Sequence, residues 1–83
     1  MHECMNRTET ARMIRAEWHA TKDATTLRMR LASMGCEDYA ERPAIKQGFI
    51  NFANDLPAMD DAAIIKRLDR LVETIDAAEG GAA

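Results

Sequence analysis

The chain has 83 residues, of which 47% are hydrophobic, and its formal net charge at pH 7 is −3. This length predicts a single helical domain spanning residues 1–83, which buries only about 60–65% of the surface that the unfolded chain exposes. No apolar run approaches the roughly 20 residues of a membrane-spanning helix, and residues 1–7 contain no hydrophobic segment of a signal peptide. We therefore expect a cytoplasmic protein that does not contact a membrane.

The first predicted helix begins after Asn6. Asn6 and Glu9 have the spacing of a capping box, in which side chains satisfy free N–H groups of the first helical turn. The apolar residues of this helix recur at i, i+3 and i+7 and form one face: Ala11, Ile14 and Trp18. We expect Trp18 to anchor the core, and an exposed Trp that binds a partner is the alternative.

The second predicted helix covers about residues 25–34, with Asp23 or Thr25 as its cap. Its apolar positions at i, i+4 and i+7 are Leu27, Leu31 and Met34. Gly35 follows directly, at the position where many helices end with a left-handed residue. We therefore expect Gly35 to end this helix.

A short helical or irregular segment is expected at residues 37–41, before a third helix that begins near Arg42 or Pro43. Proline is tolerated in the first turn of a helix but not deep inside one. The helix ends before Pro57, because a residue that precedes proline leaves helical geometry. Gly48 is either interior to this helix or the stop between two shorter ones. The residues expected to face inward are Ala44, Ile45, Phe49, Phe52 and Ala53.

The clearest periodicity lies in residues 60–78, which predict an amphipathic helix of about five turns capped by Asp60 or Asp61. Six large aliphatic residues form a broad stripe along it: Ile64, Ile65, Leu68, Leu71, Val72 and Ile75. This stripe either closes the core of the monomer or forms the interface with a protein partner or with a second copy in a homodimer. Residues 1–6 and 79–83 are expected to be flexible tails. The predicted fold is all-α, a small bundle of four to five helices with a long C-terminal helix.

Residues 27–56 carry a loose pattern of apolar residues and glycines: Leu27, Leu31, Gly35, Ile45, Gly48, Phe49, Phe52 and Leu56. In this pattern the segment resembles small bacterial helix-turn-helix proteins of uncharacterised function. The resemblance implies a helix at 27–34 followed by a helix at 37–47 that lies in the DNA major groove. Its candidate DNA contacts are Arg42, Lys46 and Gln47.

The charge distribution contains features that favour DNA binding and features that oppose it. Residues 7–30 hold six basic and three acidic residues, which adds Arg28 and Arg30 as candidate nucleic-acid contacts. Residues 1–50 carry a net charge of +1 and residues 51–83 carry −4. The presumed reading helix also contains three carboxylates, Glu37, Asp38 and Glu41, which repel phosphate. DNA binding is therefore disfavoured.

The sequence lacks a glycine-rich phosphate loop, a nucleophile elbow and an HExxH motif. His2, Cys4, His19 and Cys36 do not have the paired short spacing of zinc ligands, so we expect no metal or cofactor. Cys36 is expected to be buried or half-buried. Its neighbouring carboxylates, Glu37 and Asp38, disfavour the reactive thiolate, so we expect a poor nucleophile. A Cys4–Cys36 disulfide is the less favoured alternative to two free thiols.

These exclusions predict a small regulatory protein that is not an enzyme and that binds a larger protein partner as an inhibitor or adaptor. Small inhibitors encoded by phages and mobile elements, such as anti-CRISPR proteins, are similar to the chain in size and charge. The alternative function is a helix-turn-helix transcriptional regulator.

Overall fold

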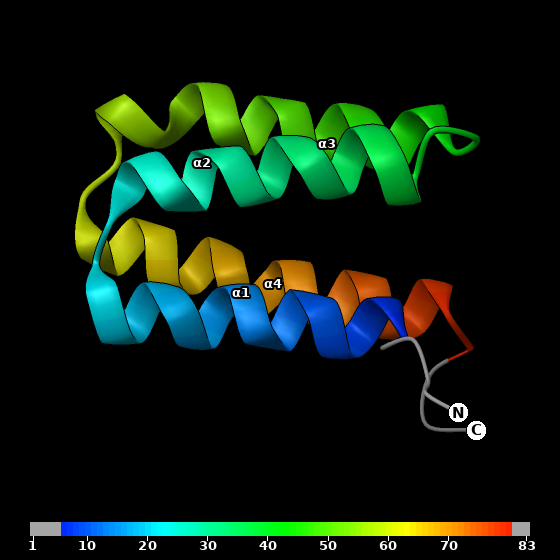
Figure 1. The fold of residues 1–83 in the computed structure, drawn as a ribbon, viewed down its shortest axis with the longest axis horizontal. Coiled ribbons are helices and arrows are strands. Elements are labelled where there is room, and N and C mark those ends of the chain that lie inside the picture. Colours follow the sequence, from blue (N-terminus) through cyan, green and yellow to red (C-terminus); the bar gives the residue numbers. More distant parts are fainter. Residues whose placement is uncertain (1–5, 81–83) are drawn as a thin grey trace.

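In the computed structural model, which describes residues 6–80, the chain forms four α-helices that run alternately in opposite directions (Figure 1). They are α1 (Arg7–Thr21), α2 (Ala24–Ser33), α3 (Pro43–Asp55) and α4 (Asp61–Ala78). A π-helical turn, η1 (Met34–Asp38), follows α2, and a 3₁₀ turn, η2 (Leu56–Ala58), follows α3. The predicted all-α bundle is confirmed. Within residues 6–80 no helix is long and apolar enough to cross a bilayer.

The bundle consists of two antiparallel pairs, because α1 packs along α4 and α2 packs along α3 (Figure 1). Helix α1 also contacts α2, whereas α3 and α4 approach each other less closely. The core lies between the pairs and is mostly aliphatic, with Phe49 and Phe52 as its largest members from α3. The four-helix arrangement is therefore looser between α3 and α4 than within the two pairs.

Short polar side chains begin the helices as the sequence predicts. Asn6 Oδ1 accepts a hydrogen bond from the Glu9 N–H at 2.8 Å, and Glu9 Oε1 accepts one from the Asn6 N–H at 3.4 Å. Asp23 and Asp60 accept hydrogen bonds from N–H groups in the first turns of α2 and α4. Asn6 is therefore part of a capping box, so its assignment to a flexible tail is wrong. Residues 1–5 lie outside the described residues.

Gly35 does not end α2 in a left-handed conformation, contrary to the prediction. Among residues 6–80 positive φ values belong to Lys22 and Gly80, and the helical path continues past Gly35 through η1. Gly35 is buried against α3, where an added Cβ would lie 2.7 Å from Phe49 Cβ. Its role is to allow α2 and α3 to approach closely. Gly48 is interior to α3, which settles the choice between its two predicted positions.

Residues 37–47 are not a single helix, which corrects the expected second helix of the helix-turn-helix pattern. Glu37 and Asp38 complete η1, residues 39–42 form a turn, and α3 begins at Pro43, whose missing N–H suits the first helical turn. Tyr39 draws this turn into the core, since it is fully buried and its ring stacks on Phe49 with centroids 5.6 Å apart. Helices α2 and α3 consequently lie side by side as an antiparallel hairpin (Figure 1).

The same tyrosine joins three distant segments at one end of the bundle. The Tyr39 hydroxyl donates a hydrogen bond to Glu79 Oε2 at 3.2 Å, and Arg7 Nη1 lies 3.4 Å from the same oxygen. The Arg7 guanidinium also lies 4.8 Å from the centroid of the Tyr39 ring. Burial, followed by the nearby Glu79 carboxylate, raises the pKa of Tyr39 to about 12. Glu79 is thus held by contacts and is not in a flexible tail, whereas residues 81–83 lie outside the described residues.

Trp18 is a core residue, as predicted, with 3% of its surface exposed. Its indole N–H is buried and has no hydrogen-bond acceptor among the described residues. The Lys22 ammonium lies 5.6 Å from the centroid of the ring and closes one side of it. Trp18 is therefore unavailable as an exposed anchor for a partner.

Candidate functional site

The aliphatic stripe of α4 lies mainly inside the monomer. Ile64, Leu68, Val72 and Ile75 are buried in the core, so these four are not a surface for a partner or a second copy. This corrects the interface prediction for them. The reason is geometric: α4 packs along α1, and these four residues belong to one core cluster with residues of the other helices, so their burial stabilises the monomer. Ile65 and Leu71 are only partly buried against the core.

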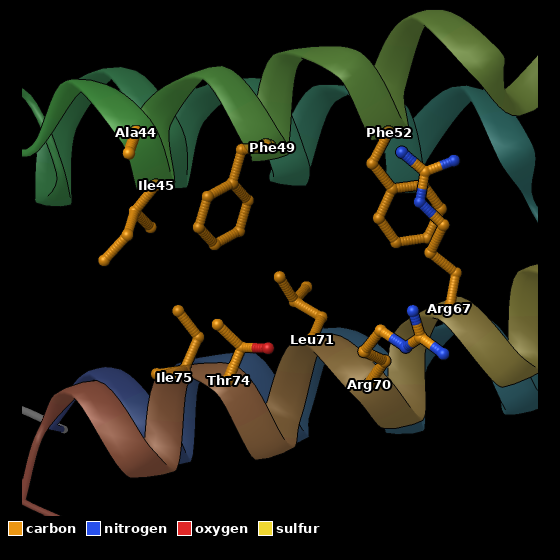
Figure 2. A pocket seen from close by; sticks show the side chains of 10 residues that line it. Ala44, Ile45, Phe49, Phe52, Arg67, Arg70, Leu71, Thr74 and Ile75 are labelled. Carbon is orange, nitrogen blue, oxygen red and sulfur yellow. The ribbon is translucent and has the colours of Figure 1, made fainter.

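Leu71 lies on the wall of a groove between α3 and α4, with a volume of about 290 Å³ (Figure 2). Ile45 and Phe49 come from α3, and Leu71, Thr74 and Ile75 project toward them from α4 (Figure 2). Phe49 and Ile75 are almost fully buried and form the floor. Half-buried Ile45 and Leu71 form the opposing walls. The groove is therefore apolar and open to solvent along its length.

Small residues at the rim explain why the groove is not filled from within the chain. Ala44 and Gly48 occupy successive turns of α3 on the groove side, and an added Cβ at Gly48 would meet nothing within 4 Å. Thr74 is the corresponding short residue on α4. Ala44 is exposed at this rim, which corrects the prediction that it faces inward. Larger side chains at these three positions would close the space that the structure leaves open.

Two guanidinium groups gather at the end of the groove nearest Phe52 (Figure 2). Arg67 Nη1 forms an ion pair with Asp55 Oδ2 at 2.9 Å, and its guanidinium lies 4.8 Å from the centroid of the Phe52 ring. Arg70 is exposed, and among the described residues it has no hydrogen-bond or ion-pair partner. The groove therefore has an apolar end at Ile45 and Ile75 and a cationic end at Arg70.

A second hollow continues the groove along the first half of α4. It is lined by Met59, Ala63, Lys66, Arg67 and Arg70, so it shares its two arginines with the groove. Lys66 is exposed and, within residues 6–80, forms no ion pair. The two hollows thus adjoin at Arg67 and Arg70, and we call the first of them, between α3 and α4, the α3–α4 groove.

The five candidate nucleic-acid contacts lie on α2 and at the start of α3, and two of them are engaged by neighbouring side chains. The Arg30 guanidinium is held by both carboxylate oxygens of Glu17, at 3.0 and 3.3 Å, and this contact raises its pKa. Gln47 donates a hydrogen bond to Asn51 Oδ1 at 2.9 Å. Arg28 is exposed on α2, Arg42 is exposed at the start of α3, and Lys46 is half-buried. Arg42 and Lys46 lie one turn apart at the start of α3, where the Lys46 N–H donates a hydrogen bond to Arg42 O at 2.9 Å.

The metal and thiol predictions fall partly outside the described residues, since these begin at Asn6 and so exclude His2 and Cys4. Within residues 6–80 no three His, Cys, Asp or Glu side chains come together as a metal site. Cys36 is a free thiol and is exposed, which corrects its expected burial. The adjacent Gly35 takes the position of η1 that faces α3, so Cys36 lies on the outer side.

None of the family models, curated proteins or solved structures compared with the chain gives a match.

The α3–α4 groove is the feature that the sequence prediction missed. The sequence does contain a signal for this groove, since Ala44 and Gly48 lie at i and i+4 on the helix face that also carries Phe52. Small residues at helical spacing allow another helix or chain to approach closely. Taken singly, Ala44 is typical of a core residue and Gly48 raises only the question of helix continuity. The two residues indicate a groove only when they are interpreted together.

Proposed function

We propose that this protein is a small, non-enzymatic regulatory protein that binds a larger protein partner, as an inhibitor or adaptor, through the α3–α4 groove. The observation that carries the proposal is an open apolar groove between α3 and α4, with the core residues Phe49 and Ile75 as its floor. Such a groove suits recognition in which an amphipathic helix lays its apolar face between two helices of the receptor.

The shape of the groove favours a helix over a compact small molecule. Its volume of about 290 Å³ is at the lower limit of pockets that enclose a drug-sized ligand, and it lies open between two parallel walls. Its small rim residues, Ala44, Gly48 and Thr74, leave room above the floor of Phe49 and Ile75. A partner side chain that entered between Ile45 and Leu71 would be desolvated on both sides, which is the usual setting of an interface hot spot.

The titratable groups support a binding role. The groove residues that carry charge are Arg67 and Arg70, and among the described residues no carboxylate, histidine or thiol lines the groove beside them. The strongly raised pKa of Tyr39 arises at the end of the bundle, in contact with Glu79 and Arg7. This tyrosine joins segments of the fold, and although its ring stacks on Phe49 it does not itself line the groove.

The proposal is tested with a matched pair of tryptophan substitutions. Thr74 is exposed and lines the groove, so Thr74→Trp fills the groove without charge and without replacing a core residue. Met29 is 66% exposed on α2 and does not line it, so Met29→Trp adds the same side chain elsewhere. Tagged wild type and both variants are purified from cells of the natural source, after circular dichroism confirms that each is folded.

Wild type and Met29→Trp are expected to recover the same protein in stoichiometric amount, and Thr74→Trp is expected to lose it. Recovery of that protein by all three chains would contradict the groove as the binding site. Recovery of nucleic acid alone by wild type would contradict a protein partner altogether.

A further inference from the structure

We infer that the α3–α4 groove is selective for an acidic amphipathic helix, whose apolar residues lie between Ile45 and Leu71 while its carboxylates meet Arg70 and Lys66. This inference rests on the proposed function and specifies the chemistry of the partner.

The two groove arginines differ in how much of their hydrogen-bonding capacity is already used. Arg67 is neutralised and fixed, by its 2.9 Å ion pair with Asp55, its stacking on Phe52 and its contact with Met59 Sδ at 3.8 Å. Arg70 lies one turn further along α4 and has no such partners among residues 6–80. Of the two guanidiniums at the cationic end, Arg70 is therefore the one with free donors for a ligand.

The two rims of the groove differ in charge. On α4, Lys66 extends the cationic end into the neighbouring hollow, so a helix that follows the groove passes two unpaired cations. On α3 the rim is uncharged beside Ala44 and Gly48. Of the carboxylates of α4 near Arg70, Asp69 pairs with Arg15 at 3.1 Å, and within residues 6–80 no ion pair joins Glu73 to Arg70. A ligand carboxylate at this end would thus meet Arg70 and Lys66, neither of which forms an ion pair within residues 6–80.

The shape of the molecule argues against a second copy of this chain as the occupant. A two-fold dimer through the groove would place one concave surface against another and leave both unfilled. The large apolar residues that are strongly exposed within residues 6–80 are Met13 on α1 and Met29 on α2, which do not form a stripe on one helix. The exposed face of α4 is charged. Among the described helices, none therefore presents the apolar ridge that the groove requires.

The overall charge of the chain limits the attraction between the groove and an acidic helix to short distances. With a net charge of −3, the protein as a whole does not attract an acidic partner at long distance. Selectivity must come from short-range contact with Arg70 and Lys66, next to an apolar surface that excludes water. Specificity of this kind depends on electrostatic complementarity at the interface.

The test is a selection from a displayed library of helical peptides about four turns long, roughly 14 residues. Apolar residues are fixed at i, i+3, i+4 and i+7, and the other positions vary among Glu, Gln and Lys. Parallel selections use wild type, Thr74→Trp, Arg70→Gln and Arg12→Gln, the last removing an exposed arginine of α1 outside the groove. Peptides enriched by wild type and lost with Thr74→Trp are defined as groove binders.

Groove binders are expected to contain an excess of Glu over Lys at the variable positions, and Arg70→Gln is expected to abolish that excess while Arg12→Gln retains it. A chosen Glu-rich binder should lose about fivefold in affinity with Arg70→Gln, and its Gln analogue should be unaffected. Groove binders with equal Glu and Lys would overturn this inference and leave the proposed function standing.

Failure to recover any groove-dependent peptide would overturn both the inference and the proposed function. A wild-type dimer that Thr74→Trp dissociates would assign the groove to a second copy and overturn the inference as well.

Discussion

Gly35→Ala is expected to destabilise the protein strongly for a change of one methyl group. The new Cβ would lie 2.7 Å from Phe49 Cβ and 3.3 Å from Phe49 Cγ. Because the Phe49 Cβ is fixed to the backbone of α3, a rotamer change cannot relieve the contact, and α2 and α3 must move apart. Overpacking of this kind costs about 1–3 kcal/mol of the free energy of unfolding.

Gly48→Ala is the matched control, since Gly48 is interior to α3 and an added Cβ meets nothing within 4 Å. Its expected effect is stabilisation by up to about 1 kcal/mol, from the greater helix propensity of alanine. Urea unfolding followed by the fluorescence of Trp18, the single tryptophan, measures both variants. The midpoints of thermal unfolding should also differ, by about 4–8 °C per kcal/mol in a chain of this size.

Equal stability of Gly35→Ala and wild type would refute the close approach of α2 and α3. Gly35→Asn distinguishes the close contact with Phe49 from the left-handed helix end that the sequence predicts. Asparagine is tolerated in a left-handed helix cap, so it would cost little there. At a buried contact it should cost at least as much as alanine.

Three further substitutions test the packing of the core, the cap of α4 and the environment of Tyr39 at the end of the bundle. Leu68→Ala should lower the free energy of unfolding by about 2–5 kcal/mol in a urea titration, because Leu68 is fully buried. A wild-type-like midpoint would contradict that burial. Asp60→Ala should cost about 1 kcal/mol by removing the cap of α4, and no change in helicity or stability would argue against the cap. The raised pKa of Tyr39 makes the folded state retain a proton that the unfolded chain loses near pH 10. The contribution of Tyr39 to stability is therefore constant below that pH and falls as pH rises from about 10 to about 12. Urea midpoints measured across this range should fall more steeply in wild type than in Tyr39→Phe.

The elements whose signals are local were predictable from sequence. Asn6 with Glu9, Asp23 and Asp60 identify helix starts through side-chain hydrogen bonds within one turn, and Pro43 marks the start of α3 through its missing N–H. These capping hydrogen bonds and the effect of proline involve residues no more than three or four positions apart. The local sequence alone is therefore enough to identify them.

The errors concern positions whose environment is set by distant residues. Gly35 is typical of a helix stop when only its neighbours are considered, yet its environment is Phe49, fourteen positions away. Similarly, the periodicity of residues 60–78 shows which residues are apolar, but it contains no information about which neighbour covers them. Packing leaves Leu71 partly exposed at the groove while it buries Leu68 completely. The groove depends on the separation between α3 and α4, which no local pattern specifies.

Methyl NMR of the complex with the recovered partner tests most directly whether the α3–α4 groove is the binding site. The isoleucine, leucine and methionine methyl groups of this protein are labelled, and the unlabelled partner is added. Binding in the groove predicts large shift changes and intermolecular contacts at Ile45 and Leu71, with unchanged signals for exposed Met13 and Met29. Changes at Met13 and Met29 with unperturbed Ile45 and Leu71 would contradict binding at this site.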